Sequence, residues 1–121
     1  GSPFPPVVHD GNVIHIAQAN NALVFPGLGL GVTVAKASRI TEPMILAAAE
    51  AVAGVAVDHT PGAPLLPAVE QLRPVSVAVA VAVAVEAQRQ GLAQTPLDDP
   101  EKQVHEAMWQ PDYPRLEIVQ G

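Results

Sequence analysis

The sequence predicts a mainly α-helical fold with little or no sheet, and two observations support this prediction. Long apolar stretches are preceded by capping residues or prolines, and two of them are followed by a glycine, which are the usual signals at helix ends. The helices are expected near residues 20–37, 41–53, 75–90 and 100–109. No internal repeat divides the chain, and its 121 residues are one domain's worth of material.

The start of the chain is predicted to be extended. Residues 1–12 carry three prolines and two glycines, and either Asp10-Gly11 or Gly11-Asn12 is typical of a turn. The apolar residues that follow, 13–16, favour a short strand. The first helix therefore begins after this segment.

Asn20 and Asn21 mark the expected start of the first helix. Either amide oxygen can accept a hydrogen bond from a backbone N–H two or three residues later. An asparagine also offers a donor and an acceptor that could orient a carboxylate, hydroxyl or amide of a ligand. Lys36 and Arg39 follow the apolar stretch, and basic residues suit a helix C-terminus.

Gly27, Gly29 and Gly31 lie within this first helix. A dinucleotide-binding loop requires G-x-G-x-x-G. The third glycine is replaced by Val32 when the motif starts at Gly27, and by Val34 when it starts at Gly29. The glycines are therefore expected to let a neighbouring element approach closely rather than to bind pyrophosphate.

The second helix is expected to begin at Thr41-Glu42-Pro43, with a hydroxyl cap, an early acid and a proline in the first turn. Gly54 is expected to end it. Residues 55–74 form a proline-rich connection that contains a short helical stretch near residues 67–72.

Residues 75–85 alternate valine with alanine, a period of two that formally indicates a strand. Both residue types are apolar, however, and the stretch continued to Gly91 is too long for an ordinary strand of about 5–6 residues. Because alanine favours helix and a glycine suits a helix exit, we predict a buried helix. The run is too short for a membrane span, which needs about 20 residues.

Pro100 is expected to open the last helix. Asp98 and Asp99 lie immediately before it, where acidic side chains favour a helix N-terminus. A pair of catalytic acids is the alternative interpretation of these two aspartates.

Composition excludes several classes of function. The net charge is −6 and the six basic residues are scattered, which argues against a nucleic-acid partner. There is no cysteine, so thiolate chemistry is excluded. No metal site is expected either, because no paired ligand spacing links the four histidines His9, His15, His59 and His105. In the absence of a signal peptide or membrane span, a soluble cytoplasmic protein is expected.

The sequence resembles the C-terminal part of malic enzymes. GSPF at 1–4 and AQANNALVFPGLGLG at 17–31 match the family pattern of G-S-P-F followed by G-Q-x-N-N-x-x-x-F-P-G-x-G-L-G. The likeness continues through SRITEPMILAAAEAVA and LLPAVEQLRPVSVAVAVAVAVEAQRQGLA to HEAMWQPDY. Ala17 and Ala19 stand where the family commonly has glycines, and the valines of 75–85 stand where it has more mixed residues.

The resemblance implies the C-terminal helical portion of a larger α/β Rossmann-type cofactor domain. Residues 1–19 would be an extended N-terminal segment, 20–109 a helical core and 110–121 a tail. Malic enzymes oxidatively decarboxylate malate to pyruvate and CO₂ with NAD or NADP and Mn²⁺ or Mg²⁺. The family's metal-binding carboxylates, its catalytic lysine and tyrosine and its G-x-G-x-x-G loop lie upstream of the matching part. The chain is therefore expected to hold no catalytic residue and to be inactive alone.

Carried over by position, Asn20 and Asn21 would bind malate and line the cofactor site. Gly1 and Ser2 would lie near the nicotinamide, unless they are the remnant of a tag. The valine and alanine surface would need a partner, either the upstream remainder of the enzyme or another copy in a homo-oligomer. The alternative function is a non-catalytic helical binding or assembly module. The residues present do not decide between NAD and NADP, or which asparagine contacts the substrate.

Overall fold

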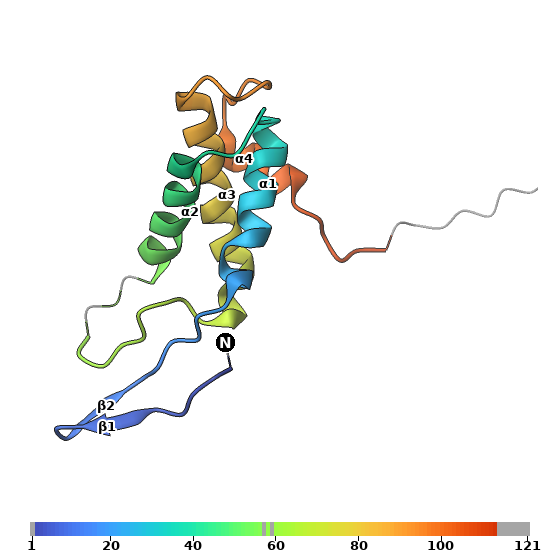
Figure 1. Cartoon of the computed structure of the whole chain (residues 1–121). Helices are drawn as coiled ribbons and strands as arrows, with labels where there is room; N and C mark the ends of the chain where they lie inside the picture. Colours follow the sequence, from blue (N-terminus) through green and yellow to red (C-terminus); the bar gives the residue numbers. More distant parts are fainter. Residues whose placement is uncertain (1, 57, 59, 114–121) are drawn as a thin grey trace, which may run out of the picture.

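The computed structural model describes residues 2–56, 58 and 60–113, which form a helical bundle preceded by a small hairpin (Figure 1). Two short 3₁₀ turns precede the first and third helices. The elements in chain order are β1 (Val7–His9), β2 (Asn12–Ile14), η1 (Asn21–Leu23), α1 (Phe25–Ala35), α2 (Glu42–Val55), η2 (Val69–Gln71), α3 (Leu72–Arg89) and α4 (Pro100–Ala107). The mainly helical prediction is confirmed. No helix in the described part of the chain is long and apolar enough to cross a membrane.

Helices α1 and α3 run parallel and pack so closely that glycine is required between them. A Cβ atom added to Gly27 would lie 2.6 Å from the Cβ of Val79, and one added to Gly31 would lie 2.5 Å from the carbonyl oxygen of Ala80. A Cβ on Gly29, by contrast, would meet nothing within 4 Å. The predicted close approach is therefore confirmed for Gly27 and Gly31, which lie one helical turn apart, and wrong for Gly29.

The alternation of valine and alanine produces uniform ridges on α3. Positions four residues apart lie above one another on a helix, and four is a multiple of the period of two. One ridge therefore consists entirely of valines, and the next consists of a serine followed by alanines. Both ridges are buried against the neighbouring helices, and their residues are Val75, Val79 and Val83, and Ser76, Ala80 and Ala84. The helix prediction is confirmed, since tertiary packing outweighs the strand preference of valine.

Helix α2 packs on α3 from the other side (Figure 1). Its buried residues are Met44, Ala48 and Val52, again four apart. The last helix, α4, contributes the fully buried Val104. The core thus lies along α3, with the other helices arranged around it.

The first helix differs from the predicted 20–37 at both ends. The chain forms the 3₁₀ turn η1, and α1 begins only at Phe25. Pro26 explains the break, because proline has no N–H with which to continue a hydrogen-bond ladder. At the other end Lys36 adopts a left-handed conformation, with φ 46° and ψ 46°, and α1 ends at Ala35.

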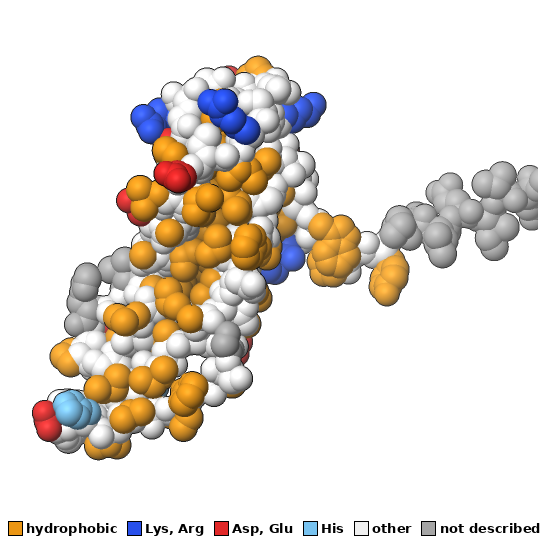
Figure 2. Space-filling view, in the orientation of Figure 1, with side chains coloured by type: hydrophobic (Ala, Val, Ile, Leu, Met, Phe, Trp, Pro, Cys, Tyr) orange, Lys and Arg blue, Asp and Glu red, His pale blue; other side chains and the backbone are white. Residues whose placement is uncertain are grey.

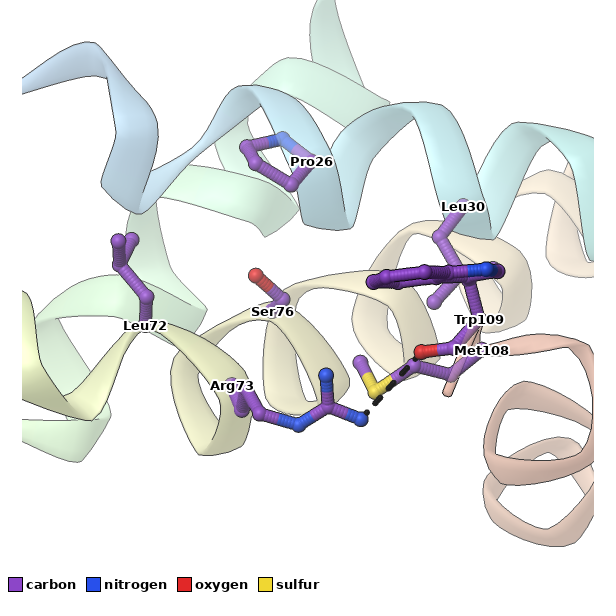
Figure 3. A pocket seen from close by; sticks show the side chains of 7 residues that line it. All are labelled: Pro26, Leu30, Leu72, Arg73, Ser76, Met108 and Trp109. Carbon is purple, nitrogen blue, oxygen red and sulfur yellow. Dashed lines mark hydrogen bonds between the residues drawn. The ribbon is translucent and has the colours of Figure 1, made fainter. Parts of the chain in front are cut away.

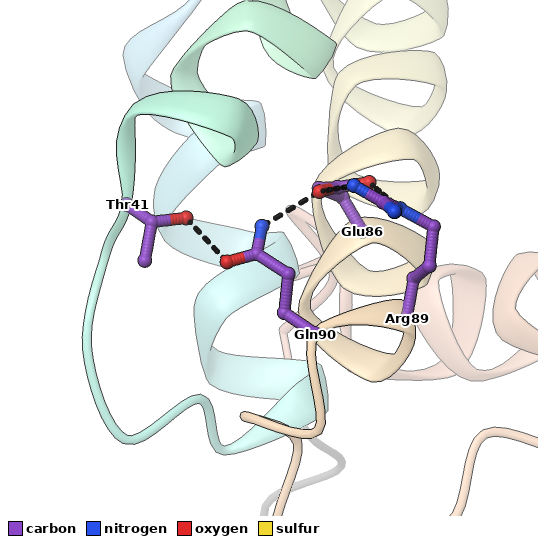
Figure 4. Close-up of polar contacts among 4 residues, drawn as sticks. All are labelled: Thr41, Glu86, Arg89 and Gln90. Atoms are coloured by element: carbon purple, nitrogen blue, oxygen red, sulfur yellow. Dashed lines mark hydrogen bonds and ion pairs between the residues drawn. The ribbon is translucent and has the colours of Figure 1, made fainter.

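Thr41 stands at the predicted start of α2, but its role as a side-chain cap is wrong. Its hydroxyl instead donates to Oε1 of Gln90 at the end of α3, at 3.1 Å (Figure 4). Gly54 does not end the helix either, since α2 continues to Val55 and is followed by Ala56. A glycine with a helical backbone is tolerated inside a helix at a cost of about 0.5–1 kcal/mol.

The ends of α3 and α4 agree better with expectation. Gly91, with φ 68°, follows α3 as predicted, although α3 begins three residues early at Leu72. Pro100 opens α4, and the side chain of Asp99 accepts a hydrogen bond from the backbone N–H of Lys102 at 3.1 Å. Asp99 is therefore a helix cap.

The N-terminal hairpin has a two-residue turn at Asp10 and Gly11, whose φ angles are 49° and 77°. Positive φ at both positions is typical of the type I′ turn, which suits the twist of paired strands. Its valines remain exposed, and Val8 is 70 % accessible. The predicted turn is confirmed, and the predicted strand pairs with the preceding residues.

Candidate functional site

The two asparagines carried over from the family pattern have different roles in the structure. Asn20 has an extended backbone, and its Oδ1 accepts a hydrogen bond from the backbone N–H of Ala22 at 3.0 Å. The amide of Asn20 is thus used to begin η1, which is the capping role that local sequence favoured.

Asn21 is the first residue of η1, and its side chain is exposed to solvent. Only its backbone carbonyl is engaged, by the N–H of Val24 at 3.0 Å. Within the described residues its amide has no hydrogen-bond partner, so both its donor and its acceptor are available to a ligand. Leu23, two residues later, is 2 % accessible and fixes the turn to the core.

The segment that leads to the asparagines is held by a loop from beyond α2. The backbone N–H of His15 donates to the carbonyl of Gly62 at 2.9 Å. Gly62 has φ 85°, and a Cβ atom there would overlap the carbonyl oxygen of Val13. Gly62 thus sets the path of the chain on its way to Asn20, and sequence reasoning did not single it out. Its only sequence signal is a proline-glycine pair at 61–62.

Of the other predicted cofactor residues, Ser2 is exposed and Gly1 lies outside the described residues. His59 lies outside them as well. In the part of the chain that the structure describes, no group of three or more histidine, aspartate or glutamate side chains could hold a metal ion.

An apolar groove of about 360 Å³ opens between the beginnings of α1 and α3 and the segment after α4 (Figure 3). Trp109 lies across one side of it, and among the described residues Arg73 is the one charged residue in its lining. Nη2 of Arg73 donates to the carbonyl of Trp109 at 3.4 Å and to Oε1 of Gln110 at 2.9 Å. Arg73 therefore fastens the segment after α4 to α3, a role that sequence reasoning missed.

A polar cluster joins α2 to the far end of α3 (Figure 4). Arg89 donates to both carboxylate oxygens of Glu86 at 2.7 Å, and Nε2 of Gln90 donates to Oε1 at 2.6 Å. The Arg89 hydrogen bonds, followed by that from Gln90, lower the pKa of Glu86 below its usual value. With Gln90 also bound to Thr41, this cluster links two helices.

The family model described as "Malic enzyme, NAD binding domain" matches residues 1–88. The chain belongs to the malic enzyme family. The Asn20-Asn21 pair and the glycines of α1 all lie within the matched range.

Curated relatives agree with the family assignment. The chain is 51% identical to "NAD-dependent malic enzyme 3" of Bacillus subtilis over 119 residues, which cover 98% of this chain and 21% of the relative. It is 47% identical to a "Putative malate oxidoreductase [NAD]" of Mycobacterium tuberculosis, over 93% of this chain and 21% of that protein. A "Malolactic enzyme" of Lactococcus lactis is 42% identical over the same shares. The chain thus spans about a fifth of the length of these relatives.

Proposed function

We propose that this chain is part of a longer malic enzyme that oxidatively decarboxylates malate to pyruvate and CO₂ with NAD, and that Asn21 binds the malate. The observation that carries the proposal is that the two asparagines differ in how their side-chain amides are hydrogen-bonded. The amide oxygen of Asn20 accepts a hydrogen bond from the backbone of η1. The neighbouring Asn21 presents a free, exposed amide within the family-matching segment.

The contribution of Asn21 is orientation rather than proton transfer. A neutral amide can donate to a carboxylate or accept from a hydroxyl without changing protonation. Holding malate with its C2 towards the nicotinamide ring lowers the barrier through positioning. Asn20 retains an amide NH₂ group with which to contact the cofactor, and Ser2 contributes an exposed hydroxyl. NAD, when bound, supplies the hydride acceptor, and Gly1 would complete its site.

A divalent metal, Mn²⁺ or Mg²⁺, does not fit the residues that the structure describes, because they hold no ligand cluster. We assign such an ion to other parts of the enzyme. The same holds for the general acid and base, so the 121-residue chain alone should be inactive. A cytoplasmic location and assembly as a homo-oligomer complete the proposal, and NADP is the alternative cofactor.

The test is to replace each asparagine by alanine in the whole enzyme. In Asn21→Ala, loss of a hydrogen bond to a charged substrate group costs about 1.5–3 kcal/mol. Catalytic efficiency with malate should then fall about 10- to 150-fold, with an unchanged melting temperature. In Asn20→Ala the lost cap costs about 1 kcal/mol and lowers the melting temperature. An Asn21→Ala enzyme that keeps its efficiency within about twofold of the original contradicts the assignment.

A non-catalytic assembly role is the second candidate, and the exposed apolar surface of the helices favours it. An enzyme preparation that contains this chain and oxidises malate with NAD excludes that role as the sole function.

A further inference from the structure

The apolar groove between α1, α3 and the segment after α4 contains a buried hydroxyl group. Ser76 of α3 lines the groove and is only 6 % accessible. Figure 3 shows its oxygen pointing from α3 towards α1, on the side of Pro26. Among the described residues this hydroxyl has no hydrogen-bond partner. Because buried polar side chains in proteins are nearly always hydrogen-bonded, the hydroxyl indicates a place for a polar group of a ligand.

Arg73 adds a positive charge to the same groove. It precedes Ser76 by three residues, so both lie on one face of α3. Its hydrogen bonds to the carbonyl of Trp109 and to Oε1 of Gln110 both come from Nη2 and both go to neutral oxygens. In the described part of the chain, no aspartate or glutamate forms an ion pair with it. The N–H groups of its Nε and Nη1 are therefore available to an anion.

Arg73 is also set apart from most of the other basic side chains. On the face of the molecule in Figure 2, lysines and arginines gather mainly at the end opposite the hairpin. Arg73 instead stands at the beginning of α3, which lies towards the hairpin (Figure 1). Its charge therefore belongs to the groove and not to a general basic surface.

The rest of the groove is apolar. Its other walls are formed by Pro26, Leu30, Leu72, Met108 and Trp109. Trp109 is 75 % accessible, and Figure 3 shows its flat indole ring along one side of the groove, near Leu30. Small-molecule sites are typically clefts of about 300–1,000 Å³ with mostly apolar walls and a few polar groups. A groove of about 360 Å³ with two polar side chains has these properties.

We propose that this groove binds a small monocarboxylate with an aromatic or alkyl body. Arg73 donates to one carboxylate oxygen and the hydroxyl of Ser76 donates to the other, and the charged donor makes the stronger bond. The apolar body packs against Trp109 and Leu30. A single cation balances a single carboxylate, so a dicarboxylate fits less well, because its second charge would lie in apolar surroundings. Neither asparagine of the proposed malate site lines the groove, so this proposal does not rest on malate turnover.

The test is a calorimetric titration of the whole enzyme with phenylbutyrate, in the presence of saturating malate and without cofactor. Malate then occupies its own site and is not oxidised. Phenylbutyrate should bind with a Kd of about 1 mM or lower, as expected for a ligand of this size. Phenylbutyramide has the same ring and chain but a neutral head group, and it should bind at least about 10-fold more weakly. Absence of saturable phenylbutyrate binding, or equally tight binding of the amide, overturns the proposal.

Two pairs of variants locate the bound phenylbutyrate. Ser76→Ala removes only the hydroxyl and should weaken binding about 10-fold, while Ser38→Ala, in the bend after α1, should leave binding unchanged. Leu30→Trp fills the groove and should abolish binding, while Leu46→Trp at an exposed position of α2 should not. Melting temperatures check that each variant is folded, and Ser76→Ala decides the question if Leu30→Trp is destabilised.

Three results would overturn the proposal. The first is equal binding of phenylbutyrate to Ser76→Ala and to the original enzyme. The second is loss of binding in Asn21→Ala, which would assign the phenylbutyrate to the malate site. The third is a smaller assembly of Leu30→Trp in sedimentation with unchanged phenylbutyrate binding, since the groove would then hold a protein partner. Malate oxidation is measured separately on the original enzyme, so failure of the proposed function is distinguished from failure of this proposal.

Discussion

Two contacts in this molecule require glycine, because a side chain at these positions would have no room. The two contacts lie in different surroundings. Between α1 and α3, Gly27 and Gly31 bring together two helices whose facing residues are buried. At the hairpin, Gly62 meets Val13 in a region where neighbouring side chains are largely exposed. The first contact holds the core together. The second sets the path of the chain towards Asn20 and Asn21.

The consequence of disturbing a close contact depends on whether the neighbouring part of the chain can move. A disturbance between α1 and α3 must move whole helices, because the atoms that a new Cβ would meet belong to the backbone and to buried side chains. A disturbance at Gly62 can be absorbed by moving the hairpin, which changes where the asparagines lie. Stability should therefore respond at the first contact, and catalysis at the second.

The largest effect is expected from Gly31→Ala. The new Cβ would lie 2.5 Å from the carbonyl oxygen of Ala80 and 2.9 Å from the Cβ of Val83. Overpacking of this kind costs about 1–3 kcal/mol, measured as the change in the free energy of unfolding in urea. Gly29→Ala on the same helix is the control. It meets no atom within 4 Å and should stabilise the protein by about 0.5–1 kcal/mol. Equal effects of the two changes would contradict the close-packing interpretation.

Gly62→Ala in the whole enzyme is expected to lower stability less than Gly31→Ala does, but it should also impair catalysis. Its φ of 85° is unfavourable for alanine by about 1–2 kcal/mol, and the added Cβ displaces Val13. The KM for malate should rise at least about fivefold as Asn21 moves. Gly11→Ala is the control, because its φ of 77° carries the same strain with nothing within 4 Å. If both variants have the original KM, Gly62 does not position the site.

Lys36→Gly should stabilise the end of the α1–α3 contact. Lys36 adopts φ 46° and ψ 46° directly after α1, a conformation in which glycine avoids a steric cost. Glycine also increases the conformational entropy of the unfolded chain, which offsets part of this benefit. The free energy of unfolding should therefore rise by about 0.5–1 kcal/mol, as measured by thermal unfolding. Lys36→Ala removes the same charge without relieving the strain, and a gain of equal size in that variant would argue against a conformational origin.

The smallest effect is expected at the opposite end of the helices, from Glu86. Hydrogen bonds from Arg89 and Gln90 lower the pKa of its carboxyl from 4.5. Because the pKa is lower in the folded state, this contribution to stability is present above pH 4.5 and is lost as the pH falls through the lowered value. Glu86→Gln should therefore flatten the pH dependence of unfolding in acid, slightly, since exposed ion pairs contribute little. Glu50→Gln on α2 is the control, because it removes one carboxylate from an exposed position.

Much of the helical part could be predicted because its signals are local. Asp99-Pro100 and Gly91 act on their own backbone, so their roles follow from the residue type. Gly54 shows the limit of such reasoning. Glycine permits a helix to end but does not force it, and α2 continues past Gly54.

The features that were missed depend on residues far apart in the sequence. The hydroxyl of Thr41 is a sound capping group by local rules, yet it bonds to Gln90, 49 residues away. Gly62 acquires its importance only through Val13, and Arg73 only through the segment at Trp109 and Gln110. For the candidate site, the residue types predicted that either asparagine could cap a helix or contact a ligand. The extended backbone of Asn20 and the hydrogen bond from Ala22 to its Oδ1 distinguish it from Asn21.

The uniform ridges of α3 have a consequence for how the fold selects its register. If the helix slid by four residues, about 6 Å along its axis, two of the three buried valines would be replaced by valine, and the third by Ala87 or Gln71 at the end of the row. The middle of α3 therefore ensures that the helices pack but does not specify where along α3 they stop. That information lies at the two ends, in the bond from Thr41 to Gln90 and the bond from Arg73 to Gln110. A few polar atoms thus select one alignment among several that the apolar core would accept almost equally well.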